Sequence, residues 1–177
     1  MKCDHSALVS IDMPAGPSEL LVIADSCSNP AYVVSDLLSQ AEHGVDSQVV
    51  LVAVDFSVAH LNAIRSELLS KASALPRCEI VRIALSKSFI LQVESMDSAI
   101  NFSNDYAPEH LILNVENAET YIKDIMNAGS VFVGKFTPES CGDYASGTNH
   151  SKSTTKYSFT DLRILTYVFG SQYSYLC

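Results

Sequence analysis

The chain has 177 residues, a length that suits one domain. Apolar residues make up 47% of it and charged residues 18%, so a hydrophobic core is expected and disorder is not. The net charge of -9 argues against nucleic-acid binding, because an acidic surface repels phosphate groups, and no apolar stretch approaches the roughly 20 residues that span a membrane.

Apolar runs alternate with helical patterns along most of the chain. In chain order, we expect a strand at residues 7–11, a loop at 12–19, a strand at 20–24, a helix at 30–43, a strand at 48–54, a helix at 58–74, strands at 79–84 and 89–93, a helix at 95–104, a strand at 111–115, a helix at 118–127, a strand at 130–133 and a polar loop at 137–150. Asn29 followed by Pro30 is typical of a helix start, and Gly44 is placed to end that helix. This alternation indicates an α/β fold with a mainly parallel sheet.

The chain divides by composition into residues 1–150 and a tail at 151–177. The tail holds four of the eight tyrosines and follows neither the helical nor the strand period, so we predict a tail of uncertain structure. Neither the GxGxxG fingerprint of dinucleotide-binding loops nor a Walker A sequence occurs.

The cysteines and the N-terminus narrow the choice of compartment without deciding between the cytoplasm and a plastid. Five cysteines, an odd number without a Cys-x-x-Cys pair, argue against a disulfide framework and against a thiolate zinc site. Free thiols in a reducing compartment are the simplest interpretation, and a metal would need His, Gln, Asp or Glu ligands. The N-terminus lacks the apolar core of a secretory signal. We expect a soluble intracellular protein, of the cytoplasm or a plastid.

Two pairs of polar residues could carry chemistry. Gln40 and His43 are three residues apart on a predicted helix, so they share a face and could reach one metal ion. The alternative is that His43 only interacts favourably with the negative end of the helix dipole. Glu109 and His110 adjoin at a strand entrance, where they could serve as general acid and base. The alternative is a solvated loop end.

The polar loop at 137–150 contributes two further candidates. Asp143 beside Gly142 suits a carboxylate ligand on a flexible turn, although a turn cap is the commoner use of such an aspartate. The run from Ser146 to His150 could bind a polar ligand or simply be exposed. Together these segments supply Gln, His and Asp for a sulfur-free zinc site, and a Glu-His pair for proton transfer.

Long motifs give the chain a family resemblance over residues 11–150. The motifs are DMPAGPSELLVIAD, DLLSQAEHGVDSQVVLV, NDYAPEHLIL, NAGSVFVG and TPESCGDYASGTNH. In this order and spacing they resemble histidinol dehydrogenase, which carries out the last two steps of histidine biosynthesis. The resemblance implies a Rossmann-like three-layer α/β domain, incomplete here. It also implies a zinc-dependent oxidation of L-histidinol to L-histidine through histidinal, with two NAD.

The resemblance also implies roles for individual residues. It implies that Gln40, His43 and Asp143 are zinc ligands, and that Glu109 activates water while His110 takes the proton of the alcohol. The residues implied to contact the substrate are Ser18, Gln40, His43 and His150. The implied partners are the small molecule L-histidinol and a second copy of the chain, in a homodimer with shared active sites.

The departures from the family pattern matter as much. Family members are more than twice this length, and the half with the NAD contacts is absent, so we expect no cofactor-binding residue in this chain. We find no family motif after His150, and a fourth zinc ligand and a substrate-binding Glu from that region are missing. We therefore expect the isolated chain to be an inactive, truncated member. The alternatives are a non-catalytic module that binds zinc and imidazole, and a gene fragment without a function.

Overall fold

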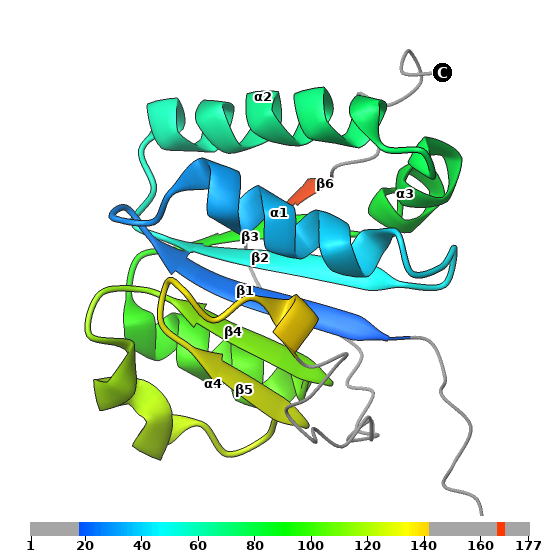
Figure 1. The fold of residues 1–177 in the computed structure, drawn as a ribbon. Coiled ribbons are helices and arrows are strands. Elements are labelled where there is room, and N and C mark those ends of the chain that lie inside the picture. Colours follow the sequence, from blue (N-terminus) through cyan, green and yellow to red (C-terminus); the bar gives the residue numbers. More distant parts are fainter. Residues whose placement is uncertain (1–17, 142–165, 169–177) are drawn as a thin grey trace, which may run out of the picture.

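The sheet at the centre of the fold is parallel except at one edge. The computed structural model describes residues 18–141 and 166–168, and within them a six-stranded sheet has the order β5-β4-β1-β2-β3-β6 (Figure 1). The strands are β1 (Glu19–Asp25), β2 (Gln48–Val54), β3 (Phe89–Val93), β4 (His110–Asn114), β5 (Ser130–Val133) and β6 (Thr166–Val168). The first five run parallel, and β6 pairs antiparallel with β3. The predicted α/β fold with a mainly parallel sheet is confirmed.

Helices cover both faces of this sheet. They are α1 (Pro30–Ala41), α2 (Val58–Ala74), α3 (Cys78–Leu85), α4 (Met96–Tyr106) and the 3-10 helices η2 (Ala118–Asp124) and η3 (Glu139–Cys141). From β1 the chain winds outward through β2 to β3. It then returns by α4 to β4 on the other side of β1, which is the topology of a doubly wound domain.

The strands bury side chains on both faces, as expected of a parallel sheet between helices. Leu20, Val22 and Ile112 pack in one cluster with residues of α1, α2 and α3. Leu21 and Leu111, which alternate with them, belong to a second cluster with residues of α4. The alternation fixes the direction of every strand side chain, and it places His110 on the same face as Ile112.

Side-chain caps start three of the helices, and the first is at the predicted Asn29. The Asn29 side chain accepts a hydrogen bond of 2.9 Å from the Ala31 N–H, with Pro30 at the first helical position. Ser57 and Ser95 cap α2 and α4 in the same way. Satisfying these otherwise unpaired backbone groups stabilises each helix by about 1 kcal/mol.

Three predictions need correction. Residues 79–84 are helical in α3, not a strand, because Val81, Ala84 and Leu85 face the core at helical spacing. Residues 118–127 form only the 3-10 helix η2, which ends at Asp124. Helix α1 ends at Ala41 with Glu42 as its cap, before the expected end at His43, and Gly44 has no positive φ. In the tail, Thr166–Val168 form β6. The strand expected at 7–11 lies outside the described residues.

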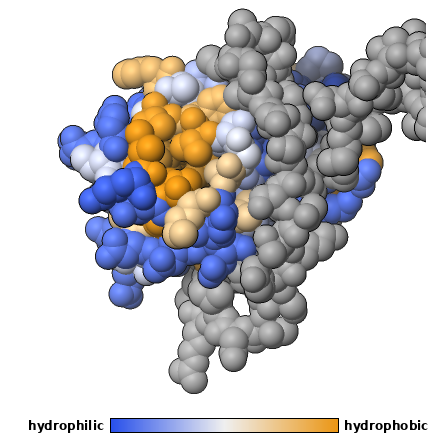
Figure 2. Space-filling model, turned by 90° about the horizontal axis from the view of Figure 1, so that it is seen from below, coloured by the Kyte–Doolittle hydropathy of each residue, from blue (hydrophilic) through white to orange (hydrophobic). Residues whose placement is uncertain are grey.

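One face of the molecule carries an apolar patch. Figure 2 shows it from below, the side on which Figure 1 places β5 and the 3-10 turn that follows β4. Exposed apolar side chains in and between these segments include Ile122, Met126 and Val131. No helix in the described part of the chain is long and apolar enough to cross a membrane.

Candidate active site at the amino edge of the sheet

Glu109 and His110 stand at the entrance of β4 and are almost completely buried. His110 Nε2 lies 3.7 Å from Glu109 Oε1, with side-chain exposures of 2% for His110 and 4% for Glu109. The His110 ring contacts Phe132 of β5 at 6.0 Å between ring centroids. The pair is therefore not a solvated loop end. The two groups are farther apart than in a hydrogen bond but close enough to interact electrostatically.

Gln40 and His43 lie at the carboxyl end of α1. The Gln40 side chain is buried, and its Nε2 has no hydrogen-bond partner among the described residues. His43 is exposed, and its Nδ1 lies 2.7 Å from the carbonyl oxygen of Ser39. A carbonyl oxygen only accepts, so Nδ1 is the donor. In the neutral ring Nε2 then carries the lone pair that a metal requires.

The topology brings these residues to one edge of the sheet. Helix α1 runs back from the carboxyl end of β1, so its last turn lies level with the amino ends of the strands, on the right in Figure 1. Ser18 immediately precedes β1, and its carbonyl accepts a 3.2 Å hydrogen bond from Gln48 at the start of β2. His110 is in register with Leu20 and faces the α1 side. Ser18, Gln40, His43, Glu109 and His110 therefore all lie along the amino edge of the sheet.

Two buried carboxyl groups that were not predicted from the sequence adjoin this edge. Ser39 Oγ donates a 2.7 Å hydrogen bond to Glu139 Oε2 in η3, and the Glu139 N–H donates to Asp36 Oδ1 at 3.4 Å. Burial raises the pKa of Asp36 from 3.8 to about 6. The Glu139 N–H lowers the pKa, and the Glu139 charge raises it. The sequence signal was an aspartate on the apolar face of a helix, four residues before Gln40.

The donors at the amino edge fit zinc. Nitrogen and oxygen ligands suit a catalytic zinc site, and a buried amide beside a histidine with a fixed ring supplies both. The described part of the chain contains no group of three His, Cys, Asp or Glu residues able to hold a metal. Of the predicted ligands, it shows Gln40 and His43. Asp143 lies outside the described residues, as does the predicted substrate contact His150.

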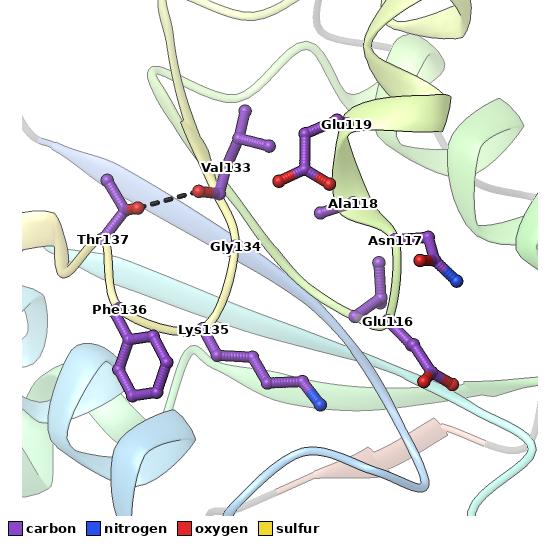
Figure 3. Close-up of a pocket in the computed structure, with 10 residues that line it drawn as sticks. Glu116, Asn117, Ala118, Glu119, Val133, Gly134, Lys135, Phe136 and Thr137 are labelled. Carbon is purple, nitrogen blue, oxygen red and sulfur yellow. Dashed lines mark hydrogen bonds between the residues drawn. The ribbon is translucent and has the colours of Figure 1, made fainter.

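A depression at the opposite edge of the sheet contains none of the predicted site residues. It has a volume of about 360 Å³ and lies between the loops that follow β4 and β5 (Figure 3). Glu116, Glu119 and Lys135 line it, and Thr137 Oγ1 donates a 2.7 Å hydrogen bond to the Val133 carbonyl. Ligands of doubly wound domains often bind near such carboxyl ends. The connection from β1 to α1 nevertheless has no glycine (residues 26–29, SCSN), so it lacks a dinucleotide-binding loop.

Comparison with known proteins identifies the family. A sequence model described as histidinol dehydrogenase matches residues 2–175. The chain belongs to the histidinol dehydrogenase family. The match extends on both sides of residues 11–150, over which the motifs indicated the resemblance, and it includes most of the tail.

Similar proteins come from fungi, plants and bacteria. The chain is 54% identical over 171 residues to the histidine biosynthesis trifunctional protein of Neurospora crassa, covering 97% of this chain and 18% of that protein. It is 60% identical over 155 residues to the chloroplastic histidinol dehydrogenase of Arabidopsis thaliana, covering 88% and 33%. A crystal structure of histidinol dehydrogenase from Elizabethkingia anophelis matches with a TM-score of 0.75 and 53% identity, over 81% of this chain and 33% of that one. The chain thus spans a third or less of these relatives.

Proposed function

We propose that this chain carries the zinc- and substrate-binding part of a histidinol dehydrogenase, which oxidises L-histidinol to L-histidine through histidinal. The observation that carries the proposal is the placement of Ser18, Gln40, His43 and the Glu109–His110 pair along one edge of the sheet. These residues come from three separated segments, and the resemblance to the family implies a role for each of them in one site.

Gln40 and His43 are the proposed zinc ligands of the described chain, with Asp143 as a third. The Ser39 carbonyl orients His43, and burial holds the Gln40 amide in place. Helix η3, which ends two residues before Asp143 in the sequence, is hydrogen bonded to α1 next to these ligands. When bound, zinc would hold the imidazole and amino groups of the substrate and so fix its position. Ser18, Gln40, His43 and His150 are the proposed substrate contacts.

Glu109 and His110 are the proposed proton-transfer residues. His110 would take the proton of the substrate alcohol as hydride leaves, and Glu109 would activate water for the oxidation of histidinal. Their burial excludes bulk water, and their separation of 3.7 Å allows the carboxylate to stabilise the imidazolium that forms. Removing either group should therefore slow chemistry more than it weakens substrate binding.

NAD does not fit the described residues. The doubly wound strand order would suit a dinucleotide. The connection between β1 and α1, however, has no glycine that would let a pyrophosphate approach the backbone. NAD as the oxidant is proposed from the family alone, and no step of the mechanism assigns a contact to it here.

The proposed assembly is a homodimer that shares its active sites. Family membership supports it, and the apolar patch near β5 offers surface that a second copy could cover (Figure 2). The relatives in Arabidopsis and rice are named chloroplastic, which supports a plastid as one of the two expected compartments.

Calorimetry of the 177-residue chain tests the binding part of the proposal. We expect heat on addition of zinc and, with zinc present, on addition of L-histidinol. His43→Gln should abolish the first heat, whereas His60→Gln on α2 should preserve it. Absence of zinc binding by the unmodified chain would refute the site and favour a fragment without function.

A chimera tests the catalytic part. The matched segment of the Arabidopsis relative is replaced by the corresponding residues of this chain, and NADH formation from L-histidinol is followed. We expect the chimera to be active and the isolated chain to be inactive. Zinc and histidinol binding without activity in the chimera would favour a non-catalytic module.

A further inference from the structure

A hydrogen bond ties the last turn of α1 to η3. Ser39 Oγ lies 2.7 Å from Glu139 Oε2 and 2.8 Å from the Asp36 carbonyl oxygen, one turn back on the same helix. The Glu139 N–H donates to the Asp36 carboxyl group at 3.4 Å. Side chain and backbone of Glu139 thus both bond to α1.

The same serine fixes the ring of His43. Its carbonyl oxygen accepts from His43 Nδ1 at 2.7 Å, and Ser39 directly precedes Gln40. Ser39 therefore bonds to η3 through its hydroxyl group and to a proposed zinc ligand through its carbonyl. A displacement of this helical turn would change the direction of His43 Nε2 and of the Gln40 amide together.

The placement of Glu139 is unfavourable for folding by itself. Glu139 is 1% exposed, and Asp36 beside it is 9% exposed. Buried carboxyl groups lose hydration, and a negative charge near the carboxyl end of a helix opposes the helix dipole. A cation held by Gln40 and His43 would offset both effects. A partner needed only to hold η3 in place could be neutral.

We propose that Glu139 and Ser39 are positioning residues of the zinc site: their hydrogen bond sets the turn of α1 from which Gln40 and His43 present their ligand atoms. The proposal rests on the proposed function, because it assumes that these two residues bind zinc. It assigns neither Ser39 nor Glu139 a direct contact with the metal.

Zinc affinity of the 177-residue chain, measured by competition with a chromogenic chelator, tests the proposal. We expect Ser39→Ala and Glu139→Ala each to weaken zinc binding about 10-fold, the effect typical of losing a partner that orients a ligand. The double variant should bind zinc no more weakly than whichever single variant has the lower affinity, because both substitutions remove the same hydrogen bond. Ser39→Thr keeps the hydroxyl group and should restore an affinity near that of the unmodified chain.

Ser73→Ala is the matched control. Ser73 Oγ bonds to a carbonyl three residues back, as Ser39 does, but on α2. Thermal melting of every variant separates loss of folding from loss of the site. With cobalt(II) in place of zinc, the visible spectrum should change in Ser39→Ala and not in Ser73→Ala, because it reports ligand geometry.

The outcomes separate this proposal from the proposed function. If His43→Gln abolishes zinc binding while Ser39→Ala and Glu139→Ala leave it unchanged, the zinc site stands and the positioning role is refuted. The positioning role would also be refuted if the fold-losses in zinc affinity of the two single variants multiplied in the double variant, since Ser39 and Glu139 would then act independently. If the unmodified chain binds no zinc, the proposed function fails, and the positioning role with it.

Discussion

His110 Nε2 and Glu109 Oε1 lie 3.7 Å apart in a setting from which water is nearly excluded. Adjacent residues of an extended strand normally point to opposite faces of the sheet. The approach is possible because β4 begins at His110, so Glu109 still belongs to the preceding loop. The Glu109 carbonyl is fixed by a 2.8 Å hydrogen bond from the Ser130 N–H of β5. The sheet therefore holds the backbone of both residues. Because Glu109 precedes the strand, its side chain is not forced to the face opposite His110.

The first prediction separates the roles of these two residues. In the chimera, His110→Asn should lower kcat by about 100-fold or more with L-histidinol as substrate, because general-base catalysis is lost. Glu109→Gln should slow the oxidation of supplied histidinal more than the oxidation of histidinol. Steady-state rates with each substrate measure both effects, and calorimetry should show zinc binding unchanged. Equal slowing of both oxidations by Glu109→Gln would contradict the division of roles.

The second prediction concerns Asp36 and pH. Its pKa is about 6 in the folded chain against 3.8 ordinarily, because burial disfavours the charged form. Protonated Asp36 therefore stabilises the fold fully below pH 3.8, and this contribution is lost as the pH rises through about 6. The difference amounts to at most about 3 kcal/mol. Asp36→Asn stays neutral, so its stability relative to the unmodified chain should rise from pH 4 to pH 8.

Urea unfolding of both proteins at pH 4, 6 and 8 measures this change. Asparagine keeps an oxygen that can accept the Glu139 N–H, so the substitution removes charge without removing that bond. Asp105→Asn, at an exposed position, controls for the change in net charge. The difference in the free energy of unfolding between Asp36→Asn and the unmodified chain should change with pH. The same difference at all three pH values would count against the burial of the Asp36 carboxyl group.

The third prediction concerns the link between two loops at the carboxyl edge. The Asp25 carboxylate accepts hydrogen bonds from the N–H groups of Cys27, at 3.0 Å, and Glu116, at 2.6 Å. It thereby joins the loop after β1 to the loop after β4. Asp25→Ala should lower the free energy of unfolding by about 1–3 kcal/mol, because two bonds to a charged acceptor are lost.

Urea unfolding again provides the measurement. Asp25→Asn should have a smaller effect than Asp25→Ala, because its amide oxygen can still accept one bond. Glu116→Gln keeps the backbone N–H that donates to Asp25 and should have little effect. A loss of stability in Glu116→Gln as large as in Asp25→Ala would show that the Glu116 side chain, and not the link between loops, is responsible.

Local signals in the sequence were sufficient for most elements and insufficient for the link at Glu139. The β-branched run of β2 and the cap Asn29 act over a few residues, so the sequence shows them directly. The hydrogen bond from Ser39 to Glu139 joins residues 100 positions apart. Nothing in either residue's local sequence specifies that pairing, which depends on the crossover of the whole sheet.

The site could be predicted only in part for the same reason. The spacing of Gln40 and His43 showed that they share a helix face, and the motifs indicated the family. That the end of α1 and the entrance of β4 lie at the same edge of the sheet follows from the return of the chain through α4, which no spacing reveals. The positions of Asp143 and His150 stay predictions.

The fourth prediction concerns α3, where local propensity and tertiary structure disagree. Its β-branched residues favour a strand, and in a strand Val81 and Ile83 would share one face. In the helix Val81 is fully buried beside Ala84 and Leu85, whereas Ile83 is 37% exposed.

Val81→Ala should therefore lower the free energy of unfolding by about 1–3 kcal/mol, because it leaves a cavity in the core. Ile83→Ala should lower it by less than about 1 kcal/mol, since its side chain remains partly in water. Urea unfolding measures both, and circular dichroism checks that helix content is kept. Equal losses in the two variants would restore the strand interpretation, because they would mean that both side chains point into the core.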